Sequence, residues 1–154
     1  MSDAASQHLK HLRRSFVLAR RAGEKGNRPF GAVLVDQNDE TLLEAENNAV
    51  TDHDITGHAE INLVREACRR FPPEQMRGCT IYASAEPCPM CSGAMFWSGV
   101  ARIVFALSSE RIYAMDPDNE NQLPLSCRDV LRHGRRHVEV VGPLFEEEAL
   151  GVFG

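Results

Sequence analysis

Two short motifs constrain this chain more than any other part of its sequence. The first is His58-Ala59-Glu60, and the second is Pro87-Cys88-Pro89-Met90-Cys91. Together they supply one imidazole, two thiols and a spare carboxylate. A zinc ion with three protein ligands keeps its fourth position open for water, whereas structural zinc takes four protein ligands. We therefore expect a fold that brings the two motifs together around a zinc ion with one open position.

Both motifs are expected at the N-termini of helices. Residues at i and i+2 do not share a helix face, so His58 and Glu60 can cooperate only from a first turn, where side chains tilt beyond the helix end. Cys88 and Cys91 are spaced i and i+3, which brings their sulfurs together. Pro89 suits the first helical position and leaves Cys88 as the N-cap. The positive partial charge of a helix N-terminus also favours thiolate over thiol.

Hydrophobic periodicity and turn residues predict the remaining elements. We expect a hairpin from the first two strands, because turn residues separate them. The segment after Leu107 is expected to be a loop. The elements alternate as in an α/β protein, which predicts a three-layer α/β/α sandwich with a mixed sheet of about five strands. The expected helices cover residues 4–22, 58–70, 89–98 and 128–133, followed by a short terminal helix, and the expected strands cover 30–35, 42–48, 80–83, 102–107 and 138–141.

Length and cysteine usage narrow the class of protein. The 154 residues predict a single domain over residues 1–154. We expect a cytoplasmic protein that does not enter a membrane, because no apolar run approaches about 20 residues and no signal-peptide core is visible at the N-terminus. Five cysteines, two of them in a C-x-x-C motif, favour metal ligands and reduced thiols over disulfides.

The charge distribution bears on the kind of partner. The net charge is −5, whereas a protein that binds RNA usually carries a basic stripe that neutralises phosphates. The longest basic run, residues 132–137, is best explained as a solvated helix end, and the acidic Glu146-Glu147-Glu148 follows it. A small molecule is therefore the expected partner, and a nucleic acid the less expected one.

The spare carboxylate indicates a hydrolytic reaction. Zinc with an open position lowers the pKa of bound water toward about 7. Glu60 would take a proton from that water and then protonate a ring nitrogen and a departing amine of an amidine-like substrate. A carboxyl group that acts twice needs a pKa near neutrality, which burial can provide. In the alternative, His53 or Cys79 completes a structural zinc site in a non-catalytic subunit.

The motifs resemble those of the cytidine deaminase-like superfamily, in particular its guanine deaminase and tRNA adenosine deaminase branch. The resemblance implies His58, Cys88 and Cys91 as ligands of one zinc ion per subunit. It also implies Glu60 as the proton shuttle. The matching stretches are Pro29-Phe30-Gly31-Ala32-Val33, Asn47-Asn48, Gly57-His58-Ala59-Glu60 and Glu86-Pro87-Cys88-Pro89-Met90-Cys91-Ser92-Gly93-Ala94-Met95.

The resemblance also implies how the pocket holds its substrate. The Asn48 amide would read the base, the Ala59 backbone N–H would lie near the reacting oxygen, and Phe30 would lie along the pocket. The plainer alternatives make Asn48 a turn residue and Phe30 a core residue. Relatives often carry Asp-Pro-Thr-Ala before the histidine, where this chain has residues 54–57, Asp-Ile-Thr-Gly. The tail at residues 152–154 is shorter than the aromatic tail that closes the pocket of bacterial guanine deaminases.

Guanine is the expected substrate, which would give xanthine and ammonia from the free base or its nucleoside. It presents two neighbouring donors, N1–H and the 2-amino group, which one carboxylate can accept together. Asp116 is the best candidate among the acids that follow Leu107. The alternatives are the wobble adenosine of tRNA and other aminated heterocycles, namely cytosine-type bases, pterins and triazines. The resemblance further implies a homodimer or a larger assembly, with Met95-Phe96-Trp97 near the interface.

Overall fold

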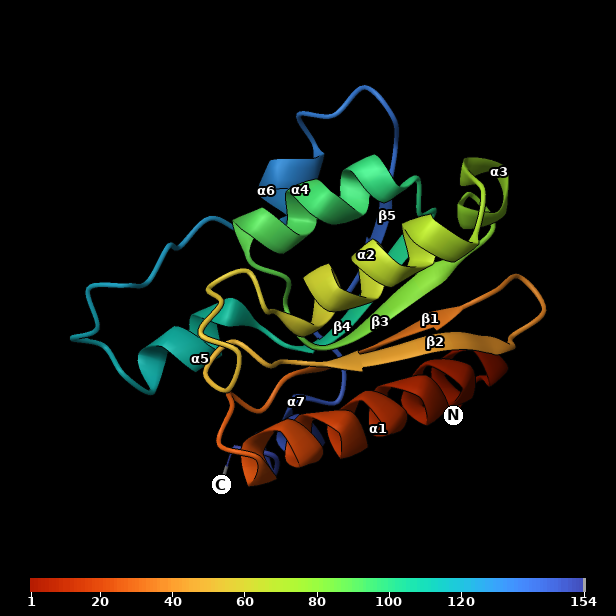
Figure 1. Ribbon diagram of the computed structural model, residues 1–154. Coiled ribbons are helices and arrows are strands. Elements are labelled where there is room, and N and C mark those ends of the chain that lie inside the picture. The colour runs from red at the N-terminus through yellow and green to blue at the C-terminus, as the bar shows by residue number, and fades with distance from the viewer. Residues whose placement is uncertain (154) are drawn as a thin grey trace.

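In the computed structural model, which describes residues 1–153, a five-stranded sheet lies between two layers of helices (Figure 1). The strand order is β2-β1-β3-β4-β5. Strand β1 is antiparallel to β2 and β3, whereas β3, β4 and β5 are parallel to one another. The expected α/β sandwich with a mixed sheet is therefore confirmed. The strands are β1 (Gly31–Val35), β2 (Thr41–Glu46), β3 (Thr80–Ala85), β4 (Arg102–Leu107) and β5 (Glu139–Val141).

The helices divide between the two faces of the sheet. Helices α1 (Asp3–Glu24) and α7 (Glu146–Leu150) cover one face, and α2 (Ala59–Arg70), α4 (Pro89–Ser98) and α6 (Cys127–Leu131) lie over the other (Figure 1). Two short helices complete the described chain, α3 (Pro73–Met76) and α5 (Ser109–Ala114). Within residues 1–153, none of the helices has both the length and the apolar character needed to cross a bilayer.

The central strands are buried on both faces because each face carries its own apolar cluster. Side chains alternate along a strand, so Val33 of β1 packs with α1 while the neighbouring Leu34 packs with α2. Gly31 begins β1 where α1 passes closest. A Cβ atom there would lie 2.4 Å from the backbone oxygen of Ser15. This close approach requires glycine in the Pro29-Phe30-Gly31 stretch.

The segment after Leu107 differs from the expected loop. Residues 109–114 form α5, and the hydroxyl of Ser108 caps this helix by accepting a hydrogen bond from the backbone N–H of Arg111 at 3.3 Å. A helix of six residues is too short to show a hydrophobic period. Helix α3 was missed for the same reason, although Pro73 occupies its first turn. The expected hairpin of β1 and β2 and the short terminal helix are present.

Candidate active site

The two motifs meet at the carboxyl end of β3. Helix α4 starts directly after Cys88, whose Sγ accepts a hydrogen bond from the backbone N–H of Cys91 at 3.4 Å. Pro89 occupies the first helical position, as expected. His58 is the N-cap residue of α2, and its extended backbone leaves the imidazole beyond the helix end. Since α2 and α4 pack against each other on one face of the sheet, their N-termini lie together.

His58, Cys88 and Cys91 fit a single zinc ion. Their ligand atoms all lie within 4.8 Å of one another. The Nδ1 atom of His58 is 3.5 Å from the Sγ of Cys88 and 3.4 Å from the Sγ of Cys91. Zinc bonds of 2.0–2.1 Å to nitrogen and 2.3 Å to sulfur, set at a tetrahedral angle, separate the two atoms by about 3.6 Å. The donor set and its spacing therefore match zinc, one ion per site.

The proposed fourth ligands of a structural site are not part of this cluster. Among residues 1–153, only His58, Cys88 and Cys91 come together as a possible metal-binding group. The Cys79 thiol lies elsewhere in the core and donates a hydrogen bond to the backbone oxygen of Gln75 at 3.3 Å. His53 is exposed in the loop before α2. The cluster therefore has the three-ligand form that leaves one coordination position free.

A hydrogen bond between the two thiols shifts their pKa values in opposite directions. A hydrogen bond from Cys91 lowers the pKa of Cys88 to about 4, and the same bond raises the pKa of Cys91 above its usual range. The hydrogen bond to Cys88 also raises the pKa of His58. Because zinc binds thiolate sulfur and neutral imidazole, zinc binding would release the proton that the cluster holds.

Glu60 lies one residue into α2 and faces the same space. Only 7% of its surface is exposed. Burial raises the pKa of its carboxyl group to about 7, and the neighbouring Cys88 thiolate contributes in the same direction. Glu60 is not a member of the metal-binding group. The site therefore combines three metal ligands with a separate carboxyl group that can both accept and donate a proton.

A cavity of about 110 Å³ opens onto this cluster. The apolar part of the cavity wall comes from two regions of the chain. Phe30 lies before the His58 motif, and the other apolar residues lie at or after the end of β3. The ring of Phe153 meets the ring of Phe30 edge to face, with centroids 5.7 Å apart. The tail of the same chain therefore supports the wall of the cavity. The lining residues are Arg28, Phe30, His58, Glu60, Ala85, Glu86, Pro87, Cys88, Pro89, Ser109, Ile112, Tyr113 and Leu125.

Glu86 joins the cysteine motif to the opposite wall. Its Oε1 atom accepts hydrogen bonds from the backbone N–H and the hydroxyl of Ser109, at 3.0 and 3.1 Å. Its Oε2 atom accepts from the backbone N–H of Cys127 at 3.0 Å. One carboxylate thus holds the first residues of α5 and α6 beside Cys88. Glu86 precedes the motif in the sequence, but its partners are distant and could not be found there.

The structure brings some of the predicted binding residues to the cavity and leaves others outside it. Phe30 lines the cavity. Ala59 is buried as the first residue of α2, so its N–H has no acceptor within the helix. The carboxylate of Asp116 accepts a hydrogen bond from Asn119 at 3.2 Å, and Asp116 is not among the lining residues.

Asn48 is held in a network beside the cavity. Its Nδ2 donates to a carboxylate oxygen of Asp52 at 2.7 Å, and its Oδ1 accepts from the Nδ2 of Asn62 at 2.8 Å. A Cβ atom on Gly57 would lie 2.5 Å from that Oδ1, so an alanine before His58 would require the Asn48 side chain to shift. Asn48 is not among the lining residues. A role in reading the base stays a prediction.

Several lining residues were not predicted from the sequence. Ile112 and Tyr113 belong to the missed helix α5, and Leu125 comes from the long segment between α5 and α6. Arg28 lies directly before the matching stretch that begins at Pro29. Its position next to a recognisable motif was the one sequence feature that could have indicated Arg28 as a lining residue.

Comparison with known proteins assigns this arrangement to a family. Residues 5–107 match the family model described as the cytidine and deoxycytidylate deaminase zinc-binding region. A probable cytosine deaminase of Schizosaccharomyces pombe is 37% identical over 154 residues, covering 97% of this chain and 91% of that protein. A tRNA-specific adenosine deaminase of Bacillus subtilis is 35% identical over 149 residues, covering 96% of this chain and 86% of that protein.

A third relative also has a solved structure. The guanine deaminase of Bacillus subtilis is 38% identical over 100 residues, which cover 64% of this chain and 64% of that protein. Its crystal structure superimposes with a TM-score of 0.65 at 34% identity, covering 71% of this chain and 69% of that one. The names of these three similar proteins refer to three different substrates.

Proposed function

Because the chain belongs to the cytidine and deoxycytidylate deaminase zinc-binding family, it is a zinc-type hydrolytic deaminase, and we propose that its substrate is a free nucleobase. Guanine is the first candidate and cytosine the second. The observation that carries this proposal is the buried carboxyl group of Glu60, which shares one small cavity with the three-ligand cluster.

Each residue of the cluster takes a definite part in the proposed reaction. His58, Cys88 and Cys91 would hold the zinc ion, which supplies a Lewis acid that lowers the pKa of water toward about 7. The Glu60 carboxylate would take a proton from the attacking water and pass it to the ring nitrogen beside the reacting carbon. The same carboxylate would then take the proton of the hydroxyl group added to the ring carbon and give it to the departing amino group. Ammonia leaves, and a carbonyl group replaces the amine on the ring.

The walls of the cavity suit a planar ring. Phe30 offers an aromatic face or edge, and Ile112 and Leu125 add apolar surface. Aromatic rings prefer offset-stacked or edge-to-face contacts, and Phe153 holds Phe30 in place from behind. The Ala59 N–H, free of any helical acceptor, is the proposed donor to the oxygen that develops on the ring.

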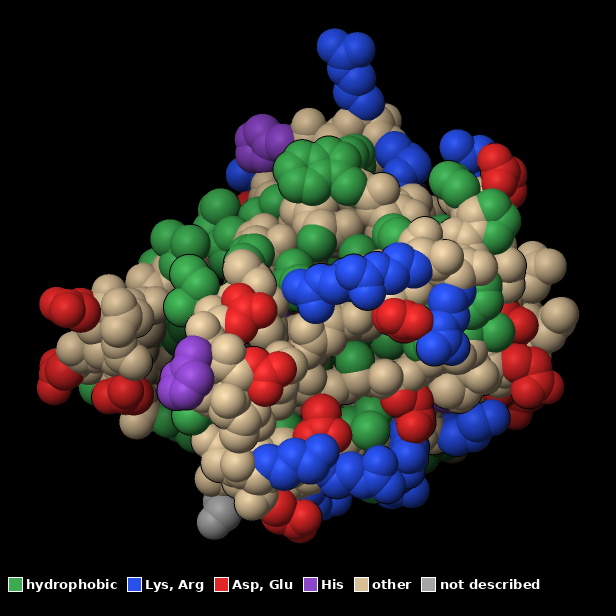
Figure 2. All heavy atoms as spheres, viewed as in Figure 1, with side chains coloured by type: hydrophobic (Ala, Val, Ile, Leu, Met, Phe, Trp, Pro, Cys, Tyr) green, Lys and Arg blue, Asp and Glu red, His purple; other side chains and the backbone are tan. Residues whose placement is uncertain are grey.

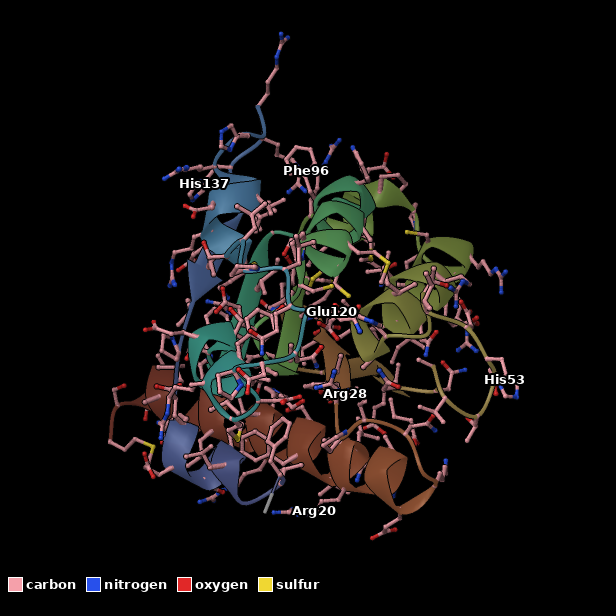
Figure 3. All side chains as sticks on the ribbon, turned by 90° about the vertical axis from the view of Figure 1, so that its left-hand side faces the viewer. Arg20, Arg28, His53, Phe96, Glu120 and His137 are labelled. Carbon is pink, nitrogen blue, oxygen red and sulfur yellow. The ribbon has the colours of Figure 1, made fainter. Side chains whose placement is uncertain are left out.

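A free base is favoured over tRNA by the charge around the cavity. The segment after α5 carries three exposed acids, Asp116, Asp118 and Glu120. Figure 3 shows Glu120 on the same face of the molecule as Arg28, which lines the cavity. Acidic side chains here would repel the phosphates of an RNA, whose binding depends on neutralising cations.

Guanine and cytosine are each supported by a separate similarity. The guanine deaminase of Bacillus subtilis resembles this chain over the zinc-binding region and its fold. The probable cytosine deaminase of Schizosaccharomyces pombe resembles this chain over nearly its whole length, at 37% identity over 97% of the chain. Asp116 would favour guanine only with its carboxylate at the ring, and this residue does not line the cavity in the structure.

A screen for ammonia release tests the proposal. The zinc-loaded protein would be incubated with guanine, cytosine, adenine, their nucleosides, a pterin, a triazine and an anticodon stem-loop. We expect turnover of guanine or cytosine, no turnover by the Glu60→Gln variant, and little dependence on added salt. Turnover of the stem-loop alone, falling steeply with salt, would contradict the proposal and identify a tRNA enzyme.

We also propose a homodimer formed through α4. Trp97 is 83% exposed and Met90 is 38% exposed, both on this helix. Figure 2 shows hydrophobic side chains at the surface over α4. Aromatic and methionine side chains are enriched at protein interfaces. Sedimentation analysis should give a dimer for the natural chain and a monomer for Trp97→Asp, and a monomeric natural chain would contradict the proposal.

A further inference from the structure

Arg28 is a cation in the cavity that the reaction described above does not use. It lines the cavity together with Glu60. Its guanidinium carbon lies 5.3 Å from the centroid of the Phe30 ring. Among residues 1–153, the structure records no hydrogen bond or ion pair from this guanidinium, whereas Arg13, Arg14 and Arg111 pair with glutamates.

Arg28 lies nearer the protein surface than the residues that would contact the reacting atoms. Glu60 and Cys91 are buried, whereas Arg28 is exposed. Figure 3 shows Arg28 and Glu120 on the same side of the molecule, with Arg28 below Glu120 in this view. A ring whose reacting carbon reaches Glu60, the buried end of the cavity, would present another part of its edge, or a group attached there, to the exposed Arg28.

The guanidinium of Arg28 limits which chemical groups of a substrate can lie next to it. Arginine has five N–H donors and no acceptor, and its planar fork matches oxygen acceptors. The contact with Phe30 holds the cation over the ring by attraction to its face. A substrate that covers Arg28 removes water from these donors, so the substrate itself must supply an acceptor.

Building on the proposed function, we propose that Arg28 determines substrate specificity by donating hydrogen bonds to a substrate oxygen that is not on the reacting carbon. A ring carbonyl of guanine or cytosine supplies such an oxygen, and so does the phosphate of a nucleotide. The adenine ring has no carbonyl. Arg28 therefore selects oxygen-bearing substrates and disfavours adenine.

The test compares two variants on substrates that differ by one oxygen. Arg28→Met keeps an unbranched apolar side chain beside Phe30 but removes every donor. Arg28→Lys keeps the charge but loses the fork. The substrate pairs are guanine with 2-aminopurine and cytosine with 4-aminopyrimidine, in which the second member lacks the carbonyl oxygen. Each nucleobase is also compared with its nucleoside 5′-monophosphate, which locates the oxygen on the ring or on the phosphate.

Arg28→Met should raise KM for the oxygen-bearing substrate about tenfold or more, because a hydrogen bond to a charged donor is lost. We expect kcat to stay within about threefold, and KM or Ki for the oxygen-free analogue to stay within about twofold. For Arg28→Lys, we expect a KM for the oxygen-bearing substrate between those of the natural chain and Arg28→Met. Arg20 is exposed on α1, outside the cavity, and Arg20→Met changes the net charge equally without these effects.

The outcomes separate this inference from the proposed function. An active natural enzyme whose KM is unchanged in Arg28→Met, or shifts equally for both members of a pair, overturns the role of Arg28 alone. A natural enzyme that releases ammonia from none of the compounds overturns the proposed function and this inference with it. Zinc content and thermal midpoint, measured for every variant, must match those of the natural chain.

Discussion

Glu86 accepts two hydrogen bonds from Ser109, one from the backbone N–H at 3.0 Å and one from the hydroxyl at 3.1 Å. The two residues come from the segments that follow β3 and β4, which are parallel neighbours in the sheet. The other oxygen of Glu86 accepts from the backbone N–H of Cys127. The cysteine motif and the wall that carries Ile112 and Tyr113 are therefore fixed relative to each other by one carboxylate.

Glu86→Gln should loosen this wall. The amide replaces an acceptor oxygen by a donor nitrogen, so at least one backbone N–H loses its partner, at a cost of about 1–3 kcal/mol. We expect a lower thermal midpoint and a higher KM, with zinc still bound. Glu110→Gln is the matched control, since Glu110 is exposed in α5. Equal thermal midpoints and KM values for the two variants would refute this role of Glu86.

Removing a zinc ligand should affect both binding and stability. Cys91 is a fully buried residue of α4, the helix that packs against α2. The Cys91→Ala variant keeps only two of the three zinc ligands. Because metal binding to a folded site adds to folding stability, this variant should lose zinc and unfold at a lower temperature. Chelation of zinc from the natural chain should lower the midpoint in the same direction. Cys68→Ala, a change at an exposed cysteine, should do neither.

Asp116→Asn tests whether the segment after α5 reads the base. In the structure the Asp116 carboxylate accepts from Asn119 and lies outside the cavity. Because Asp116 is exposed and does not line the cavity, we expect Asp116→Asn to change KM for guanine by less than about twofold. A large rise in KM, with folding intact, would show that this segment carries Asp116 into the cavity when guanine binds.

Acid should weaken one contact far from the cavity in a defined pH window. The hydrogen bond with His11 holds the pKa of Asp39 below its ordinary value. As the pH falls, Asp39 is therefore protonated in the unfolded chain before it is protonated in the folded one. The contact contributes its full share to the free energy of unfolding above the ordinary pKa of Asp39, and this contribution is lost as the pH falls through the lowered pKa. Asp39 is partly exposed, which limits the contribution to less than about 1 kcal/mol.

Urea unfolding of the natural chain and Asp39→Asn between pH 7 and pH 3 measures that contribution. Asparagine tolerates the left-handed backbone of residue 39, whose φ is 65°. Both proteins keep the same zinc site, so the difference in the free energy of unfolding isolates the carboxylate. The difference should shrink as the pH falls. A difference that is constant from pH 7 to pH 3 would contradict the pKa direction.

The part of the site that sequence could predict is the part that depends on local spacing. Cys88 as N-cap and Pro89 at the first helical position follow from the motif itself, and the structure has both. Glu86 and Arg28 act through partners that only the folded sheet brings near. Helix α5 was missed because its six residues are too few to show a hydrophobic period. That residues 1–154 form one domain stays a prediction.

The central claim is that Glu60 moves protons without binding the metal. The most direct measurement is the zinc content and the turnover of Glu60→Gln, assayed beside the natural chain on the substrate identified in the screen. We predict one zinc ion per chain in both proteins and a loss of at least about a hundredfold in kcat, as for removal of a general acid–base group. Loss of zinc together with activity, or activity that survives the change, would contradict the account.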